Sequence, residues 1–196
     1  MHQSNRYLSV HVETTGLNQD IEKPVCEGHD VVVVSFAVCD RSFKLLDQTT
    51  VIFNQKEEEY GQEFHHITPA ILEDSGVSEE EGVIELSSFI LEHFDPDEYI
   101  VCLGQNVHSF TIPFLKQLFY RNEVFFKFSS NSLELFSLTT PTIGPFTVME
   151  LVEMFGDVDD LDVNDEETVK YLSLMKALTF VRVTRKIHKA WKKLIE

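Results

Sequence analysis

The 196-residue sequence contains no long hydrophobic run, no low-complexity tract and no linker rich in proline, glycine or serine. None of its apolar stretches approaches the roughly 20 residues that a membrane-spanning helix needs. Its N-terminus, MHQSNRYLS, lacks the basic-then-apolar order of a signal peptide. A chain of this length can bury a full core without metals or disulfides. These absences predict a compact, soluble protein and argue against a membrane partner.

Cysteine is also scarce, and its distribution argues against disulfides. Cys26, Cys39 and Cys102 make an odd count, and their spacing does not form a zinc knuckle. Cys39 and Cys102 lie in apolar runs, where a reduced, buried thiol is the usual outcome. We therefore expect an intracellular, reducing location, namely the cytoplasm.

Positive charge is scarce over most of the chain. Residues 1–181 hold 10 lysines and arginines against 32 acids, a net charge of −22, whereas residues 182–196 hold six against one, a net charge of +5. An acidic body repels a phosphate backbone, whose neutralisation by lysine and arginine supplies most non-specific affinity for nucleic acid. The acidity either keeps the protein in solution or binds a basic partner. Only the C-terminal segment has the sign that nucleic acid requires.

The first half of the chain predicts strands followed by a helix. Residues 6–13, 30–39 and 43–53 are rich in Val, Ile, Phe and Thr, which is typical of three successive strands in an antiparallel meander. Residues 79–94 place apolar side chains at helical spacing, and Ser78 with Glu81 forms a candidate capping box at the start.

The second half predicts one more strand and three helices. A buried strand is expected at 99–104, followed by helices at about 109–122, 146–156 and 165–193. Gly156 is a natural C-cap for the second of these helices, and Asn164 an N-cap for the last. The order as a whole predicts an α/β protein with a mixed sheet covered by helices.

Four sequence segments, taken in order, resemble one known family. They are VETTGL at 12–17, HHIT at 65–68, GQNVHSFTIPFL at 104–115 and FTVMELVEMFG at 146–156. Together they resemble the DnaQ-like (DEDD) 3'-5' exonucleases, and the likeness spans nearly the whole chain. The resemblance implies a ribonuclease-H-like fold over residues 1–181, with residues 182–196 as a basic, amphipathic helical extension.

The family's chemistry, as the resemblance implies it, depends on acids that hold two divalent cations about 4 Å apart. Position by position, the first acid falls on His11, the second on Glu13 and the third on Thr111. Asn106 keeps the asparagine of the second motif. Glu13 is the only metal-ligand position retained here, so this is a degenerate site.

The remaining two family positions, a general-base histidine and the last acid, fall within residues 163–174. This stretch, VNDEETVKYLSL, contains no histidine, and one register places Val163 and Thr168 at the two positions. Asp165, Glu166 and Glu167 are candidates for displaced ligands, but acids at a helix N-terminus are also typical capping and dipole partners. Metal binding is therefore not expected.

The substituted residues each allow two interpretations. His11 with Glu13 is a thin site for a softer metal such as zinc, and the alternative is a structural imidazole. Glu13 is expected as a structural acid that accepts hydrogen bonds from the turn at Thr14, Thr15 and Gly16.

These observations predict a pseudo-exonuclease that binds a protein partner, with no cofactor. The acidic body fits a basic nucleic-acid-binding surface on an enzyme or complex that processes nucleic acid. One alternative is an active exonuclease with rearranged ligands, which would use Mg²⁺ or Mn²⁺, and another is a non-catalytic nucleic-acid-binding module. The chain has no Gly-rich phosphate loop and no G-x-S-x-G motif, so those routes of catalysis are not supported.

The C-terminal segment FVRVTRKIHKAWKKLIE carries the candidate binding residues. As a helix it aligns Val183, Ile187, Trp191 and Leu194 in one apolar stripe. In one interpretation the stripe docks on the protein's own sheet and the basic residues pair with the acidic body; in the other it projects and binds a partner through Trp191. The binding candidates are Arg185, Lys186, Lys189, Trp191, Lys192 and Lys193.

Overall fold

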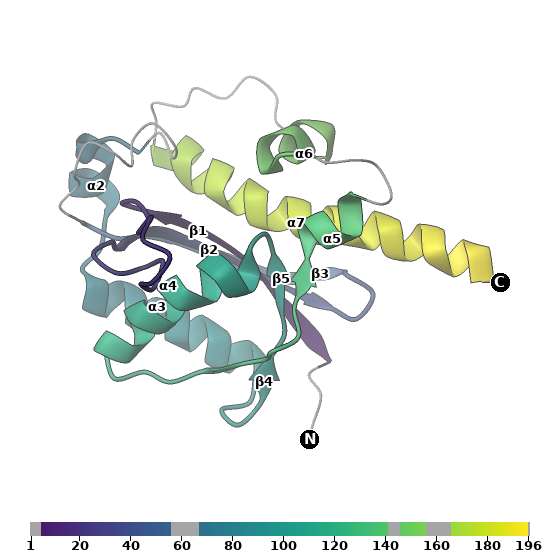
Figure 1. The fold of residues 1–196 in the computed structure, drawn as a ribbon, viewed down its shortest axis with the longest axis horizontal. Coiled ribbons are helices and arrows are strands. Elements are labelled where there is room, and N and C mark those ends of the chain that lie inside the picture. Colours follow the sequence, from purple (N-terminus) through teal and green to yellow (C-terminus); the bar gives the residue numbers. More distant parts are fainter. Residues whose placement is uncertain (1–4, 56–66, 141–145, 156–165, 196) are drawn as a thin grey trace.

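The structure is a computed structural model that describes residues 5–55, 67–140, 146–155 and 166–195 (Figure 1). Its centre is a five-stranded mixed sheet in the order β3-β2-β1-β5-β7. The strands are β1 (Arg6–Thr14), β2 (Val31–Asp40), β3 (Leu45–Ile52), β5 (Cys102–Gly104) and β7 (Leu133–Glu134). β1, β2 and β3 pair antiparallel, which confirms the predicted meander, and β5 and β7 continue the sheet in parallel.

Helices cover both faces of the sheet (Figure 1). One face carries α3 (Glu79–His93) and α4 (Ile112–Arg121), and the other carries α7 (Glu166–Ile195) with α6 (Val148–Phe155) beside it. The predicted capping box is present, because the Ser78 hydroxyl and the Glu81 carboxylate each bond the other's backbone N–H at the start of α3. The predicted class of a mixed sheet flanked by helices is confirmed.

Several elements differ from the sequence prediction. The strand expected at 99–104 is broken at Val101 into β4 (Tyr99–Ile100) and β5. β4 pairs with β6 (Lys127–Phe128) in a separate two-stranded sheet, whereas the Val101 carbonyl accepts from the amide of Leu8 in β1. The chain therefore changes its pairing partner at Val101. The helix expected at 109–122 starts earlier, as a π-helical turn η1 (Val107–Thr111) that leads into α4. The short helices α2 (Pro69–Ser75) and α5 (Leu135–Thr139) were not predicted.

The helix expected at 146–156 is α6, and the last helix is a single α7 that crosses residues 181 and 182 without a break. The division of the chain at that point stays a prediction. Gly156, Asn164 and the pair His65 and His66 lie outside the described residues.

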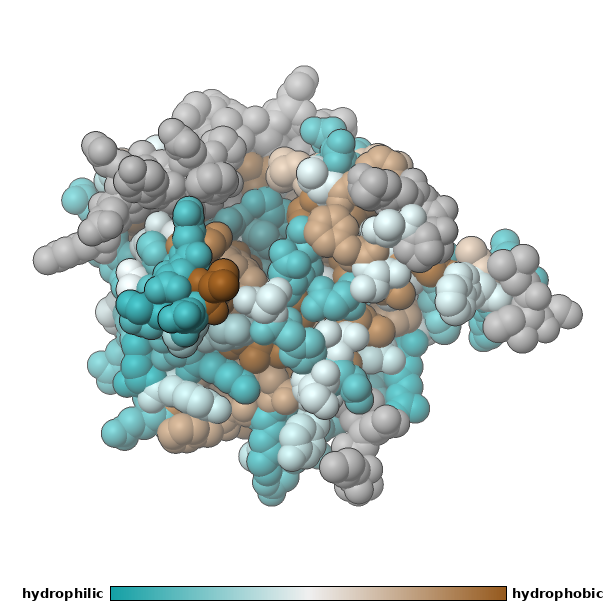
Figure 2. All heavy atoms as spheres, viewed as in Figure 1, coloured by the Kyte–Doolittle hydropathy of each residue, from teal (hydrophilic) through white to brown (hydrophobic). Residues whose placement is uncertain are grey.

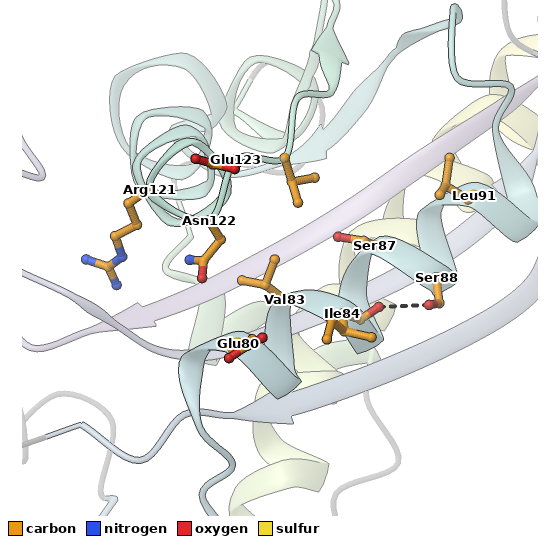
Figure 3. Close-up of a pocket in the computed structure, with 10 residues that line it drawn as sticks. Glu80, Val83, Ile84, Ser87, Ser88, Leu91, Arg121, Asn122 and Glu123 are labelled. Carbon is orange, nitrogen blue, oxygen red and sulfur yellow. Dashed lines mark hydrogen bonds between the residues drawn. The ribbon is translucent and has the colours of Figure 1, made fainter.

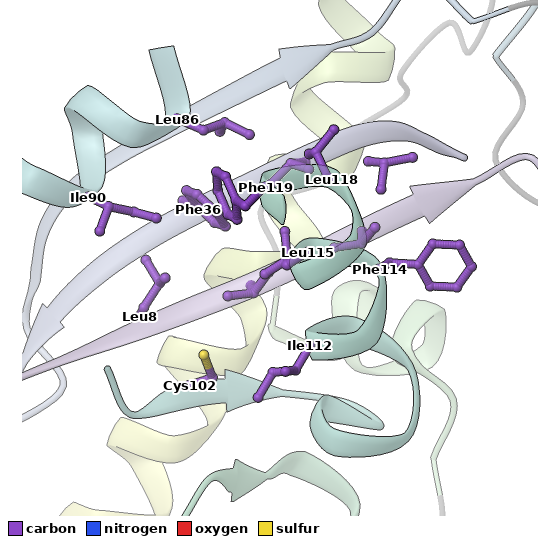
Figure 4. Packing of buried hydrophobic residues seen from close by; sticks show 14 of the residues in the cluster. Leu8, Phe36, Leu86, Ile90, Cys102, Ile112, Phe114, Leu115, Leu118 and Phe119 are labelled. Atoms are coloured by element: carbon purple, nitrogen blue, oxygen red, sulfur yellow. The ribbon is translucent and has the colours of Figure 1, made fainter. Parts of the chain in front are cut away.

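Side chains of β1 alternate between two cores. Leu8, Val10 and Val12 face α3 and α4 within a large apolar cluster that also contains Phe36 and Phe114 (Figure 4). The opposite face of β1 and β2 is more polar, although α7 covers it. Ser9 donates to the Ala177 carbonyl (2.7 Å) and the Ser35 hydroxyl donates to that of Ser173 (2.8 Å). These buried hydrogen bonds fix α7 in register over the two central strands.

All three cysteines are buried and free. Burial raises the pKa of the Cys39 and Cys102 thiols to about 12, so both are protonated at neutral pH. Cys26 is buried as well, which the sequence pattern did not indicate. Within the described ranges, no helix combines the length and apolar character needed to cross a membrane.

Candidate functional site

His11 and Glu13 lie together on the α7 side of β1, because alternate residues of a strand point to the same face. His11 Nε2 is 2.7 Å from Glu13 Oε1, and the two side chains are 16% and 14% exposed. Phe180 of α7 packs edge-on against the His11 ring. His11 and Glu13 therefore share one face of β1 and contact each other there.

Lys176 of α7 completes the arrangement. Its Nζ donates to the same oxygen, Glu13 Oε1, and its side chain is 14% exposed. Sequence comparison with the family motifs did not identify this residue. The sequence signal for it was weak: Lys176 stands between the apolar residues Met175 and Ala177, both of which are buried in α7.

The protonation states follow from burial and charge. Burial lowers the pKa of His11, and the nearby Lys176 charge lowers it further, against the opposite effect of Glu13. Burial alone would raise the pKa of the Glu13 carboxyl, but the contacts with His11 and Lys176 outweigh it and lower the pKa to about 2. At neutral pH the group is a carboxylate held by an ammonium and a neutral imidazole.

The turn after β1 does not bond Glu13, contrary to the sequence interpretation. Thr14 Oγ1 donates to the Gly16 carbonyl (2.8 Å), and Thr15 Oγ1 accepts from the Asp30 amide (3.0 Å). The physical reason is the strand geometry, which turns the Glu13 side chain toward α7 rather than along the chain.

Thr111 is the last residue of the π-helical turn η1 and Asn106 is its N-cap, and η1 lies against β1 and β5. Thr111 is 3% exposed, and its hydroxyl is 3.4 Å from the Gln105 carbonyl, which it faces as donor. Asn106 has left-handed backbone angles, and its carbonyl accepts from the amides of Phe110 and Thr111. Its side chain is exposed and makes no capping hydrogen bond. Both residues therefore shape the turn, and neither offers an acid.

The positions proposed for the last two family residues are not described. Val163 and Asp165 precede the described part of α7, and the side chains of Glu166, Glu167 and Thr168 lie outside the described set. The structure therefore brings together His11, Glu13 and Lys176, with η1 beside β1.

The C-terminal part of α7 divides into a docked and an exposed portion. Val183 is buried and Ile187 packs against the second core, while Trp191 is 59% exposed. Lys186 lies over the Phe155 ring, 4.4 Å from its centroid. In the space-filling view this end of the helix stands out from the body (Figure 2). Arg185, Lys189, Lys192 and Lys193 form no ion pair with another residue of the described ranges.

A separate cluster of potential metal ligands consists of Asp47, Glu92 and His93, the one such group among the described residues. His93 Nε2 is already 3.0 Å from Asp47 Oδ2. The guanidinium of Arg6 lies 3.4 Å from His93 Nδ1 and donates to the His93 carbonyl at 2.8 Å. A cation would have to break the imidazole–carboxylate contact beside an arginine, so this cluster is a structural network at the end of α3.

Comparison with known proteins supports the fold. No family model and no curated protein sequence matches the chain. Escherichia coli Exonuclease I in complex with a dT13 oligonucleotide matches with a TM-score of 0.69 and 13% identity, over 98% of this chain and 43% of that one. Its complex with a 5cy-dT13 oligonucleotide matches with a TM-score of 0.68 and 14% identity, over 98% and 42%.

A third solved structure, of a moderately thermophilic enzyme, gives the same result. Exonuclease I from Methylocaldum szegediense matches with a TM-score of 0.67 and 13% identity, over 96% of this chain and 41% of that one. This chain spans about two fifths of the length of these structures. It has the exonuclease ribonuclease-H-like fold, and identities this low show the fold alone.

Proposed function

We propose that this chain is an exonuclease-like protein that has lost two-metal catalysis and acts by binding a protein partner. The observation that carries the loss of catalysis is the Lys176 ammonium on the Glu13 carboxylate. Two divalent cations require several anionic oxygens. Here one carboxylate oxygen already has two donors, and Thr111 supplies a buried hydroxyl where the family has an acid. Among the residues that the structure describes at this site, the ligands do not fit the metal pair.

Charge supports the choice of partner. Residues 1–181 carry a net charge of −22, which favours a basic protein surface over a phosphate backbone. A basic surface on an enzyme or complex that processes nucleic acid has this chemistry. Affinity purification from the native host, with elution in a salt gradient, should recover a basic protein that leaves as ionic strength rises.

Calorimetry and nuclease assays test the loss of catalysis. Titration with Mg²⁺ or Mn²⁺ at millimolar concentration should give no binding heat, and single-stranded DNA and RNA should remain uncut. EDTA-sensitive degradation by the purified protein, abolished by Glu13→Ala, would overturn the proposal. An active exonuclease with rearranged ligands would then be the function.

A variant with two acids restored provides a second test. His11→Asp with Thr111→Asp should not produce a robust nuclease, because Lys176 still occupies the carboxylate and the 163–174 stretch has no histidine. Strong metal-dependent activity in this variant would show that the site still accommodates nucleic acid and metal.

A second candidate function is nucleic-acid binding through the end of α7. Arg185, Lys189, Lys192 and Lys193, which are exposed and form no ion pair within the described ranges, favour it together with the exposed Trp191. Structures with the same fold have been solved with bound oligonucleotide or single-stranded DNA. Basic side chains with an interleaved aromatic residue are suited to a single strand.

A further inference from the structure

A groove lies between α3 and the end of α4, on the sheet face opposite α7 (Figure 3). It has a volume of about 530 Å³, with apolar walls formed by Val83, Ile84 and Leu91 of α3 and by Val124 beyond α4. Ile84 is 59% exposed and Leu91 is 52% exposed, so the apolar wall is open to solvent. We call this feature the α3–α4 groove. Contiguous open apolar surface of this kind marks an interaction site more strongly than isolated apolar residues do.

The rim of the α3–α4 groove is acidic. Glu80 and Glu123 line it, and neither forms an ion pair with another described residue. Arg121 also lines it, but its guanidinium is bound by Asp30 and Glu79. An incoming basic group therefore meets two available carboxylates and a positive charge that is already neutralised.

The groove also contains a hydroxyl without a partner. Ser87 Oγ is buried and has no hydrogen-bond partner among the described residues, whereas the neighbouring Ser88 donates to the Ile84 carbonyl at 2.8 Å. Figure 3 shows Ser87 pointing from α3 toward the Asn122 side of the groove. Because this oxygen is buried within the chain, the groove offers an occupant its apolar wall and its acidic rim.

The end of α7 has the complementary chemistry. It presents Arg185, Lys189, Lys192 and Lys193 without ion pairs in the described ranges, around a Trp191 that is 59% exposed. An indole combines a large apolar ring with a single N–H donor. Because α7 packs on the opposite face of the sheet and its end points away from α3 (Figure 1), this tail does not reach the groove of its own chain.

We propose that the C-terminal end of α7 docks into the α3–α4 groove of a second copy of the chain. Trp191 lies against Ile84 and Leu91, and the lysines of the tail face Glu80 and Glu123. Tryptophan is enriched among residues that dominate binding energy, and complementary charges fix the orientation of partners. Since groove and tail are different surfaces, the contact is head to tail and adds copies in sequence.

The affinity follows from the size of the contact. A few helical turns in one groove form an interface at the small end of the known range, so association is weak and salt-dependent. The α3–α4 groove is separate from Glu13, and the inference therefore holds whether or not the proposed loss of catalysis does.

Sedimentation equilibrium of the full chain tests self-association. At low salt, the weight-average mass should rise above the 22.6 kDa monomer as concentration increases from about 5 to about 500 micromolar, the range expected for a small interface. Raising the salt concentration to about 0.5 M should return the mass to that of the monomer. A constant monomer mass at low salt over the whole range would overturn the proposal.

Matched variants test the two surfaces. Ile84→Asp in the groove and Trp191→Ala in the tail should each abolish association, and Glu123→Lys should weaken it at least tenfold. Met154→Asp and Glu73→Lys change an exposed methionine and an exposed acid elsewhere and should leave it unchanged. Thermal melts check that every variant is folded. Association that survives both Ile84→Asp and Trp191→Ala would refute the assignment.

A mixing experiment distinguishes this contact from any symmetric one. The Ile84→Asp chain keeps its tail and the Trp191→Ala chain keeps its groove, so each alone should be a monomer. Mixed in equal amounts, they can form one contact and should give a dimer that does not grow further. No association in the mixture would show that the two surfaces do not bind each other.

Discussion

At the residue scale, the main feature is a carboxylate that the protein itself neutralises. Glu13 is nearly buried, and its oxygen accepts from the imidazole of His11 and the ammonium of Lys176. A cation from α7 thus supplies the positive charge that a buried acid on this strand requires. The carboxylate and the ammonium therefore balance one another within the folded chain.

Removing Lys176 should leave a buried charge without its main partner. We expect Lys176→Met to lower the free energy of unfolding by about 2–4 kcal/mol, since breaking a buried pair leaves an uncompensated ion. Glu13→Gln with Lys176→Met should cost less than the sum of the single changes, with a coupling of about 1–3 kcal/mol. Urea denaturation of the four proteins measures this.

A matched control is available on the surface. Lys23 and Glu27 form an exposed i,i+4 pair, with side chains 52% and 49% exposed. Lys23→Met should change the stability by less than about 1 kcal/mol. Equal losses for Lys176→Met and Lys23→Met would contradict the buried-pair interpretation.

The same group predicts the acid stability of the protein. The pKa of Glu13 is lowered from 4.5 to about 2, so the unfolded chain takes up this proton first as pH falls. Stability from Glu13, about 3 kcal/mol, is fully present above pH 4.5 and is lost between pH 4.5 and 2. The pKa of His11 is lowered from 6.5, so the stability linked to its neutral form is present above pH 6.5 and is lost as pH falls below that value.

Urea midpoints measured from pH 7 to pH 3 separate the two contributions. His11→Gln should flatten the dependence that starts near pH 6.5, and Glu13→Gln the one below pH 4.5. A pH profile that neither substitution changes would mean that the two residues are not coupled to folding.

At the element scale, α7 joins the core and the exposed basic end. Val183 and Thr184 are 1% and 4% exposed, whereas from His188 to Lys193 the side chains are exposed. His188 still contacts the Phe43 ring edge-on. The helix therefore changes from a buried to an exposed element after about this residue.

Two truncations test this change. Ending the chain after Val181 removes buried Val183 and should lower the free energy of unfolding by more than about 2 kcal/mol. Ending it after His188 removes exposed side chains and should change stability by less than about 1 kcal/mol. Differential scanning calorimetry measures both. A loss of the cooperative melt after the shorter deletion would show that the exposed end is part of the core.

The sequence predicts the long elements because their signals are local. The run VVVVSFAVC reports a strand buried on both faces, and Ser78 with Glu81 reports the start of α3. The two-residue strands β6 and β7 exist only through their partners, and the break at Val101 depends on the amide of Leu8. Lys176 was missed for the same reason, because its partner Glu13 is 163 positions away in sequence.

At the scale of the whole molecule, charge is divided between body and tail. The body carries −22 over residues 1–181 and the tail +5 over residues 182–196. The exposed end of the tail, from about Lys189, projects from the body rather than folding back to neutralise it (Figure 2). A molecule of this kind attracts basic surfaces over most of its area and acidic ones at a single end.

This asymmetry predicts the salt dependence of nucleic-acid binding through the tail. Arg185, Lys189, Lys192 and Lys193 have no ion pair in the described ranges, and Lys186 lies over the Phe155 ring, so about four cations of the tail are available for phosphates. Each phosphate neutralised on a single strand contributes about −0.7 to the slope of log K against log salt. The slope should therefore be no steeper than about −3, with weak binding opposed by the body.

Fluorescence anisotropy with single-stranded DNA in a salt series measures this slope. Lys189→Glu with Lys192→Glu should abolish the binding, whereas Lys116→Glu, a lysine of α4 on the opposite face, should leave it unchanged. Trp191→Ala should weaken it without changing the slope, since stacking on a base releases no counterion. A slope much steeper than about −3 that survives the tail substitutions would place the nucleic acid on the body despite its charge.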